Sequence, residues 1–146
     1  MSDLYDSDIV LWSEQQADLL RRRAAGELVN DAELDWPNIA EEIKAVGSEQ
    51  RHAVESRLVQ VLIHRLKMAA WPEASAVPHW EAEACVFLDN ARRRFVPSMR
   101  QRLDLAVLYR QALRGLPSTL DGRPPLPVAD VCPFKLDELL AEACCG

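Results

Sequence analysis

The spacing of apolar residues along the chain predicts helices over most of its length. Apolar side chains recur every three or four residues over 7–25, 35–46, 48–71, 78–95 and 99–116, which is the period of an amphipathic helix. We expect Asp6 or Ser7 to cap the first helix and Gly26 to end it. Gly47 and Ser48 are expected to break or kink the chain between the second and third helices. No run alternates apolar and polar residues as a half-buried strand does, so the predicted class is all-α.

The range 58–71 has the composition of a central helix. On a helical wheel its apolar residues occupy most of the circumference, Gln60, His64 and Lys67 share one narrow stripe, and Arg65 alone interrupts the apolar side. A helix that is apolar over so much of its girth is typical of the middle of a bundle. A charge buried without a partner is costly, so we expect Glu41 or Glu42 to pair with Arg65 and pin the second helix to the third.

The chain changes character after Gly115. Five of its nine prolines fall in residues 116–134, which predicts an irregular or extended segment. A last short helix is expected within 134–143. The length of 146 residues is typical of one domain, so we predict a single helical domain of about five helices. Its core bundle would occupy about 5–116 and its proline-rich tail 117–146.

Charge and composition exclude several classes of function. The net charge of −6 argues against nucleic-acid binding, which needs a basic surface. The acidic start of the chain is unlike a secretory signal, and no apolar run is long enough to span a membrane. We therefore predict a cytoplasmic protein. Its four cysteines form no CxxC pair and are expected to be reduced thiols, while the state of Cys144 and Cys145 stays open.

Several polar residues form a candidate site. They are carboxylates, amides, imidazoles and one amine in the second and third helices: Asn38, Glu41, Glu42, Glu49, His52, Gln60, His64 and Lys67. Glu49 and His52 have the Glu-x-x-His spacing of a di-iron ligand set, which needs two such pairs. Neither His64 nor His79 supplies the second pair, so we predict no metal, and we expect no cofactor.

The same residues also suggest acid–base chemistry, which the pattern supports weakly. His64 and Lys67 lie one turn apart and could act as a general base and an electrostatic stabiliser. No Ser or Cys nucleophile and no glycine-rich loop has a recognisable spacing to them, so a solvent-facing or hydrogen-bonded stripe is the favoured interpretation. Glu41 and Glu42 point about 100° apart and cannot face each other as an acid–base pair. We assign no catalytic residue.

The chain resembles the bacterial family known as domain of unknown function 29. The resemblance rests on an ordered set of short motifs rather than on any single one: Tyr5-Asp6, Trp12, Leu34-Asp35, Asn38-Ile39-Ala40-Glu41-Glu42-Ile43, Leu62-Ile63-His64, Trp71-Pro72, Pro97-Ser98-Met99-Arg100 and Cys132-Pro133-Phe134. It implies a compact helical bundle with no established activity. The segment 73–77 departs from the family pattern, which tends to place basic and polar residues there.

Two hypotheses follow. The first is a non-enzymatic helical module that binds a protein partner or associates with itself, for example as a homodimer. The alternative is a metal-binding protein or enzyme that uses a cluster of Glu and His side chains. The second hypothesis requires that at least three of five candidate side chains converge in one pocket. These five are Glu42, Glu49, His52, His64 and Lys67.

Overall fold

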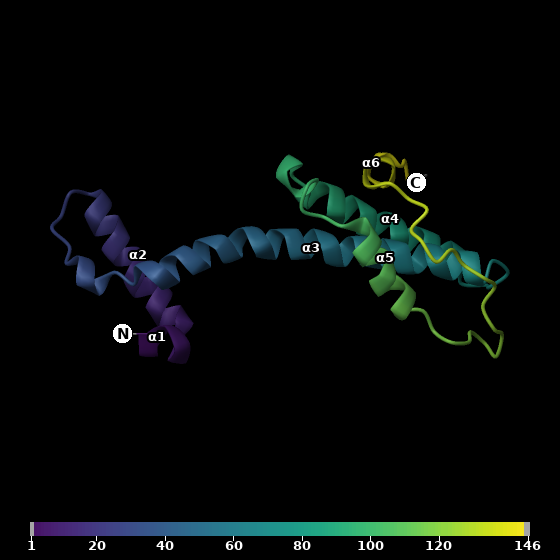
Figure 1. The fold of residues 1–146 in the computed structure, drawn as a ribbon, viewed down its shortest axis with the longest axis horizontal. Coiled ribbons are helices and arrows are strands. Elements are labelled where there is room, and N and C mark those ends of the chain that lie inside the picture. The colour runs from purple at the N-terminus through teal and green to yellow at the C-terminus, as the bar shows by residue number, and fades with distance from the viewer. Residues whose placement is uncertain (1, 145–146) are drawn as a thin grey trace. The chain divides into compact units, whose positions relative to one another are not determined.

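The computed structural model describes residues 2–144, and its secondary structure confirms the all-α class (Figure 1). The helices are α1 (Ser2–Ser7), α2 (Ile9–Ala24), α3 (Trp36–Ala70), α4 (Val77–Arg94), α5 (Leu105–Arg114) and α6 (Leu136–Ala141), with short 3-10 turns η1 (Asp31–Glu33) and η2 (Pro97–Met99). Among the described residues the one extended pairing is an isolated bridge between Leu120 and Arg123. In this part of the chain no helix combines the length and the apolar character that crossing a membrane requires.

Packing divides the chain into two compact units, Met1–Ser48 and Glu49–Gly146, and the division falls inside α3. The buried residues follow it, because the apolar cluster of the first unit is separate from the two clusters of the second. The expected core bundle over 5–116 is thus replaced by separate cores. That the whole chain acts as one domain stays a prediction.

The first unit is held by Trp12, which is 5% exposed. The edge of its ring meets Tyr5 at a centroid distance of 4.9 Å, and its Nε1 donates to Asp35 Oδ2 at 3.0 Å. Gln16 binds the backbone just before α3 through both ends of its side-chain amide. Its Nε2 donates to the carbonyl of Glu33, and its Oε1 accepts from the amide of Asp35. These bonds satisfy the backbone where the chain enters α3.

The ends of α2 follow from local chemistry, although the predicted cap is wrong. Asp6 and Ser7 lie in α1, and the cap of α2 is Asp8, whose carboxylate accepts from the amide of Leu11 at 3.0 Å. Gly26 ends the helix as predicted. Its φ of +88° allows the amide of Glu27 to reach the carbonyl of Arg22, a bonding pattern common at helix C-termini.

The expected break at Gly47 and Ser48 does not occur. The α3 helix runs without interruption from Trp36 to Ala70, so the two predicted helices are one. A glycine in a helix interior lowers stability but does not by itself end the helix, since its amide and carbonyl still form the helical bonds.

In the second unit, the other helices pack around the C-terminal half of α3. Its main core contains side chains from α3, α4, α5 and α6, with the residues exposed by less than 2% being Val54, Leu58, Val61, Leu62, Leu88, Ala91, Tyr109, Ala112 and Leu139. The α5 helix is shorter than predicted because Asp104 caps it, accepting from the amides of Ala106 and Val107.

The segment between α5 and α6 lies on its own bundle. Leu126 donates its amide to the carbonyl of Ala70 at 2.9 Å, and the Nε1 of Trp71 donates to the carbonyl of Arg123 at 3.1 Å. The buried hydroxyl of Tyr109 donates to the carbonyl of Ala129 at 2.6 Å. These three bonds satisfy backbone groups that a proline-rich segment cannot pair within itself.

Two glycines with opposite roles give a matched test of helix continuity. We expect Gly47→Ala to raise the free energy of unfolding by about 1 kcal/mol, because a Cβ built there meets no atom within 4 Å and alanine favours the helix. Gly26→Ala should lower it by about 1 kcal/mol, because alanine is strained at positive φ. Urea unfolding monitored by circular dichroism measures both. A destabilising Gly47→Ala would contradict a continuous α3.

Candidate functional site

His64 is the candidate residue that the structure buries, with 6% of its surface exposed. Its Nδ1 lies 2.6 Å from the backbone carbonyl of Gln60, and its Nε2 lies 2.7 Å from Oε2 of Glu83 in α4. The ring also packs against Phe87 at a centroid distance of 5.7 Å. The prediction of a solvent-facing stripe is therefore wrong for His64, and its hydrogen-bonded alternative is correct.

Both nitrogens of His64 lie within hydrogen-bonding distance of oxygen atoms. A carbonyl oxygen can only accept, so Nδ1 carries a proton. The hydrogen bond from His64 is the main cause that lowers the pKa of Glu83, and the nearby charges of His79, His64 and Lys67 lower it further against the opposing effect of burial. The contact with Glu83 occupies the second ring nitrogen, so both nitrogens of His64 are engaged within the protein.

Glu83 is the centre of a small polar cluster. Its Oε1 lies 3.2 Å from Nε2 of His79, one turn earlier on α4 and 70% exposed at its side chain. Lys67 lies near enough to affect the carboxylate, and its Nζ sits 5.7 Å from the ring centroid of Trp80. Glu83 was not predicted from the sequence as a site residue, because it lies 19 residues from His64, on the next helix.

This cluster ties α3 to α4 and leaves no free nitrogen on His64 to accept a proton from a substrate. Over the described residues, no group of three or more His, Cys, Asp or Glu side chains is placed to hold a metal ion. The geometry therefore favours a structural ion pair over a general base.

The remaining candidate residues do not join this cluster. Asn38 donates to Asp35 Oδ2 at 2.8 Å rather than to Glu42, and Glu42 accepts from the hydroxyl of Tyr5 at 2.6 Å. Glu41 is exposed. In the first unit these polar side chains serve packing at the start of α3.

Glu49 and His52 are both exposed on α3. They precede His64 by 15 and 12 residues, which is about 22 Å and 18 Å along a helix. At least three of five candidates had to converge for such a site, and Glu42, Glu49 and His52 are thus absent from the His64 cluster.

Arg65 finds a carboxylate, but from the other end of the chain. Its guanidinium binds Glu142 through two hydrogen bonds, with Nη1 to Oε1 at 3.0 Å and Nη2 to Oε2. The predicted partners Glu41 and Glu42 are wrong. The apolar residues around Arg65 in the sequence predicted that it needs a carboxylate partner. They could not predict that this partner lies 77 residues away.

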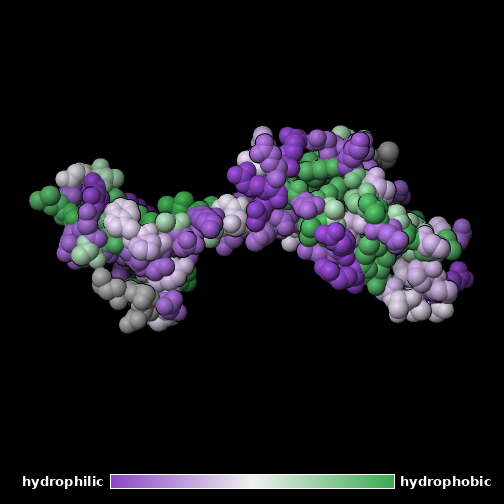
Figure 2. All heavy atoms as spheres, in the orientation of Figure 1, coloured by the Kyte–Doolittle hydropathy of each residue, from purple (hydrophilic) through white to green (hydrophobic). Residues whose placement is uncertain are grey.

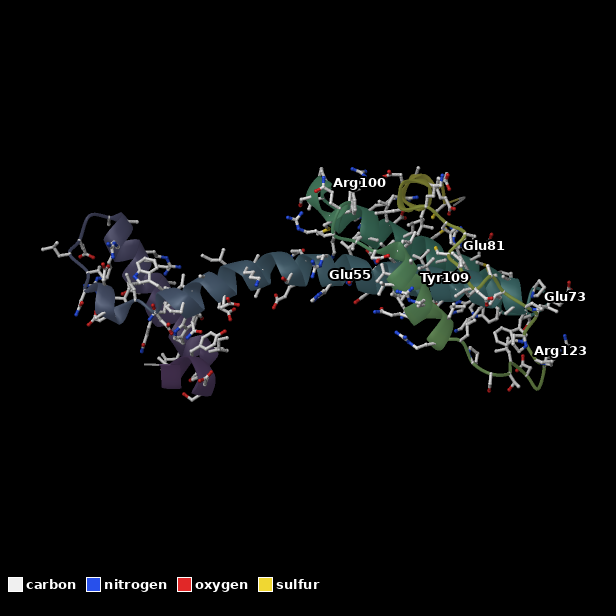
Figure 3. The ribbon with its side chains drawn as sticks, in the orientation of Figure 1. Glu55, Glu73, Glu81, Arg100, Tyr109 and Arg123 are labelled. Atoms are coloured by element: carbon white, nitrogen blue, oxygen red, sulfur yellow. The ribbon has the colours of Figure 1, made fainter. Side chains whose placement is uncertain are left out.

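A separate cavity of about 440 Å³ lies where α3 ends. Trp71 and Pro72 line it together with the turn 120–126, and Glu73 and Arg123 add charged groups (Figure 3). Its volume lies in the range of small-molecule sites. The candidate residues from the sequence contribute none of its lining.

The comparisons with known proteins agree with the fold. A family model described as "Domain of unknown function DUF29" matches residues 4–145, which confirms the resemblance noted from the motifs. Among solved structures, the chain is similar to an alpha-helical protein of unknown function from Rhodospirillum rubrum, with a TM-score of 0.69 and 27% identity over 94% of this chain and 89% of that chain. The search of curated proteins gives no match.

Removing the carboxylate of Glu83 should destabilise the protein at neutral pH only. The pKa of Glu83 in the folded protein lies below its ordinary value of 4.5, so its stabilising effect is present above that pH and is lost as the pH falls through the lowered pKa. We expect Glu83→Gln to lower the free energy of unfolding at pH 7 and to have little effect near about pH 3. Urea titrations at both values measure this.

The control for Glu83 is Glu81→Gln, which removes an exposed carboxylate on the same helix that has no hydrogen bond or ion pair with any described residue. Equal losses in the two variants, or a Glu83 effect that is independent of pH, would contradict the His64 pair.

A double-mutant cycle should assign the partner of Arg65. We expect Arg65→Met and Glu142→Gln to show a coupling energy of about 1 kcal/mol, because the pair is bidentate and half-buried. The same cycle with Glu42→Gln should give a coupling near zero, since groups without contact act additively. Chemical unfolding of the single and double variants provides both values. A coupling energy between Arg65 and Glu42 would instead support the pairing predicted from the sequence.

Proposed function

The chain belongs to the DUF29 family, and we propose that it is a non-enzymatic module whose N-terminal unit binds a partner protein through an apolar helix face. The observation that carries this proposal is a row of exposed apolar side chains on α3. The partner would present an apolar patch flanked by basic side chains.

The apolar face comprises Trp36, Ile43 and Val46, which are 46%, 70% and 63% exposed. At about 100° per residue these three positions fall within about 80° of each other on α3, so they form one stripe. Gly47 lies on the same side with open space around it, which would let a partner helix approach closely. Figure 2 shows apolar residues at the surface of this part of the chain. Exposed apolar side chains that gather on one face of a helix are typical of protein interaction sites.

Charge indicates the chemistry of the partner. Residues 1–48 carry 11 Asp and Glu and 4 Lys and Arg, a formal charge of −7, whereas residues 49–146 carry 12 acidic and 13 basic residues. The acidic character of the protein is therefore concentrated in the unit with the apolar stripe. Opposite charge around an apolar centre accelerates association and selects partners. The acidic N-terminal units of two copies of this chain would repel each other. This repulsion favours a different protein as the partner over a second copy.

The non-enzymatic part of the proposal is supported by the candidate site. The His64 and Glu83 groups satisfy one another, and the other Glu and His candidates lie elsewhere on the chain. A binding role requires no convergence of these groups, only the exposed stripe.

Site-specific photo-cross-linking in the cells that express the protein natively tests the proposal. A photoreactive amino acid at position 43 should capture one defined protein, and the same residue at position 131, where Val131 is 77% exposed in the other unit, should not. With the captured protein purified, Ile43→Asp should weaken binding at least about tenfold, because an apolar side chain of this size contributes about 2 kcal/mol when buried.

Val131→Asp is the control and should bind as the wild type does. Added salt should also weaken binding, because charge steers the encounter. Cross-linking to a second copy of this chain would mean self-association instead. Equal capture at positions 43 and 131, or no capture at position 43, would contradict the proposal.

A further inference from the structure

The C-terminal segment that contains α6 lies against the bundle (Figure 1). Its Cys144 lines the same pocket as Cys85 of α4. Leu139 of α6 is fully buried in the main core. On α4, Arg92 donates from Nε to the carbonyl of Leu140 at 2.6 Å, and on α3 Arg65 holds Glu142. Three successive anchors therefore fix the backbone that leads to Cys144.

The register of these anchors places Cys144 beside Cys85. Cys85 precedes Arg92 by seven residues, so the two lie on the same face of α4 and about 10 Å apart along it. From Leu140 to Cys144 the chain advances four residues, which span up to about 13 Å when extended. Cys85 and Cys144 accordingly line one hollow, together with Phe134.

The two thiols also affect each other directly. A side-chain hydrogen bond with Cys144 is the first cause that raises the pKa of Cys85 to about 11, followed by burial and the charge of Cys144. The neighbouring Cys144 and burial therefore favour the protonated form of Cys85. The two thiols line the same pocket, and both are free in the structure.

We propose that Cys85 and Cys144 form an oxidation site at which a peroxide converts the two thiols into an intramolecular disulfide. Half-exposed paired thiols with a nucleophile and a resolving partner are the arrangement from which such disulfides form. The bond would link α4 covalently to the segment after α6.

The reaction balances in two steps. The thiolate of Cys144 attacks one oxygen of hydrogen peroxide, the O–O bond breaks, and Cys144 becomes a sulfenic acid as hydroxide leaves and takes a proton to form water. Neutral sulfenic acid removes the charge that disfavoured ionisation of Cys85. The Cys85 thiolate then attacks the sulfenic sulfur, the S–O bond breaks, and the departing hydroxide takes the proton that Cys85 released to form a second water. Two thiols are oxidised and one peroxide is reduced.

Cys132 provides the contrast within the same unit. Its thiol donates to the carbonyl of Phe134 at 3.5 Å, and it packs half-buried against the main core. No second thiol of the described residues is paired with it. Oxidation should thus be selective for the Cys85 pair. Cys145 lies outside the described residues and enters the test as a competitor.

Peptide mapping of the full-length protein after treatment with hydrogen peroxide, without reductant, tests the proposal. We expect a cross-linked pair of peptides containing Cys85 and Cys144, lighter by two hydrogens than the sum of the free peptides and separated by reduction with dithiothreitol. The disulfide closes a long loop, so the melting temperature of the oxidised protein should rise by roughly 5–10 °C.

Four serine variants decide the assignment. Cys85→Ser and Cys144→Ser should each abolish the cross-linked peptide and the rise in melting temperature, while Cys132→Ser and Cys145→Ser should retain both. If Cys85→Ser fails to fold by circular dichroism, Cys85→Ala replaces it. A Cys144–Cys145 disulfide, an intermolecular disulfide, or over-oxidation of Cys144 with Cys85 still free would overturn the proposal.

Discussion

The second unit is organised by the need to remove the C-terminal half of α3 from water. Val54, Leu58, Val61 and Leu62 form one stripe that is inaccessible to solvent, while the partly buried Val59 and Ile63 and the buried His64 lie on other sides of the same helix. One neighbouring helix could cover only one of those sides. The α4 and α5 helices and the C-terminal segment are therefore all required, and the packing of each follows from the apolar girth of α3.

Polar side chains inside this packing set the positions of the covering elements. His64 reaches Glu83 on α4, Arg65 reaches Glu142 after α6, and Tyr109 reaches the carbonyl of Ala129. Each group would be costly to bury alone, so each pairing favours one arrangement of the chain over others of similar apolar burial. The anchoring of the C-terminal segment by Arg65 is also what brings Cys144 to α4.

The two units differ in net charge and in the apolar side chains that they expose to solvent. The second unit is close to neutral, and its His64 and Arg65 are paired with Glu83 and Glu142. The first has a small core around Trp12, most of the net negative charge, and an exposed apolar stripe on α3. A proposed role in protein binding therefore rests on the first unit, and a proposed sensitivity to oxidation rests on the second. The two proposals use different residues and can fail independently.

The sequence by itself determined the all-α class, the identity of most helices and the end of α2 at Gly26, because periodicity and capping are local properties. It also showed that Arg65 needs a carboxylate. Tertiary structure decided which carboxylate, and it decided that His64 faces Glu83 rather than solvent, because partners on different helices are distant in sequence. The continuity of α3 through Gly47 was decided by helical hydrogen bonding across the position, which outweighs the low helix propensity of a single glycine.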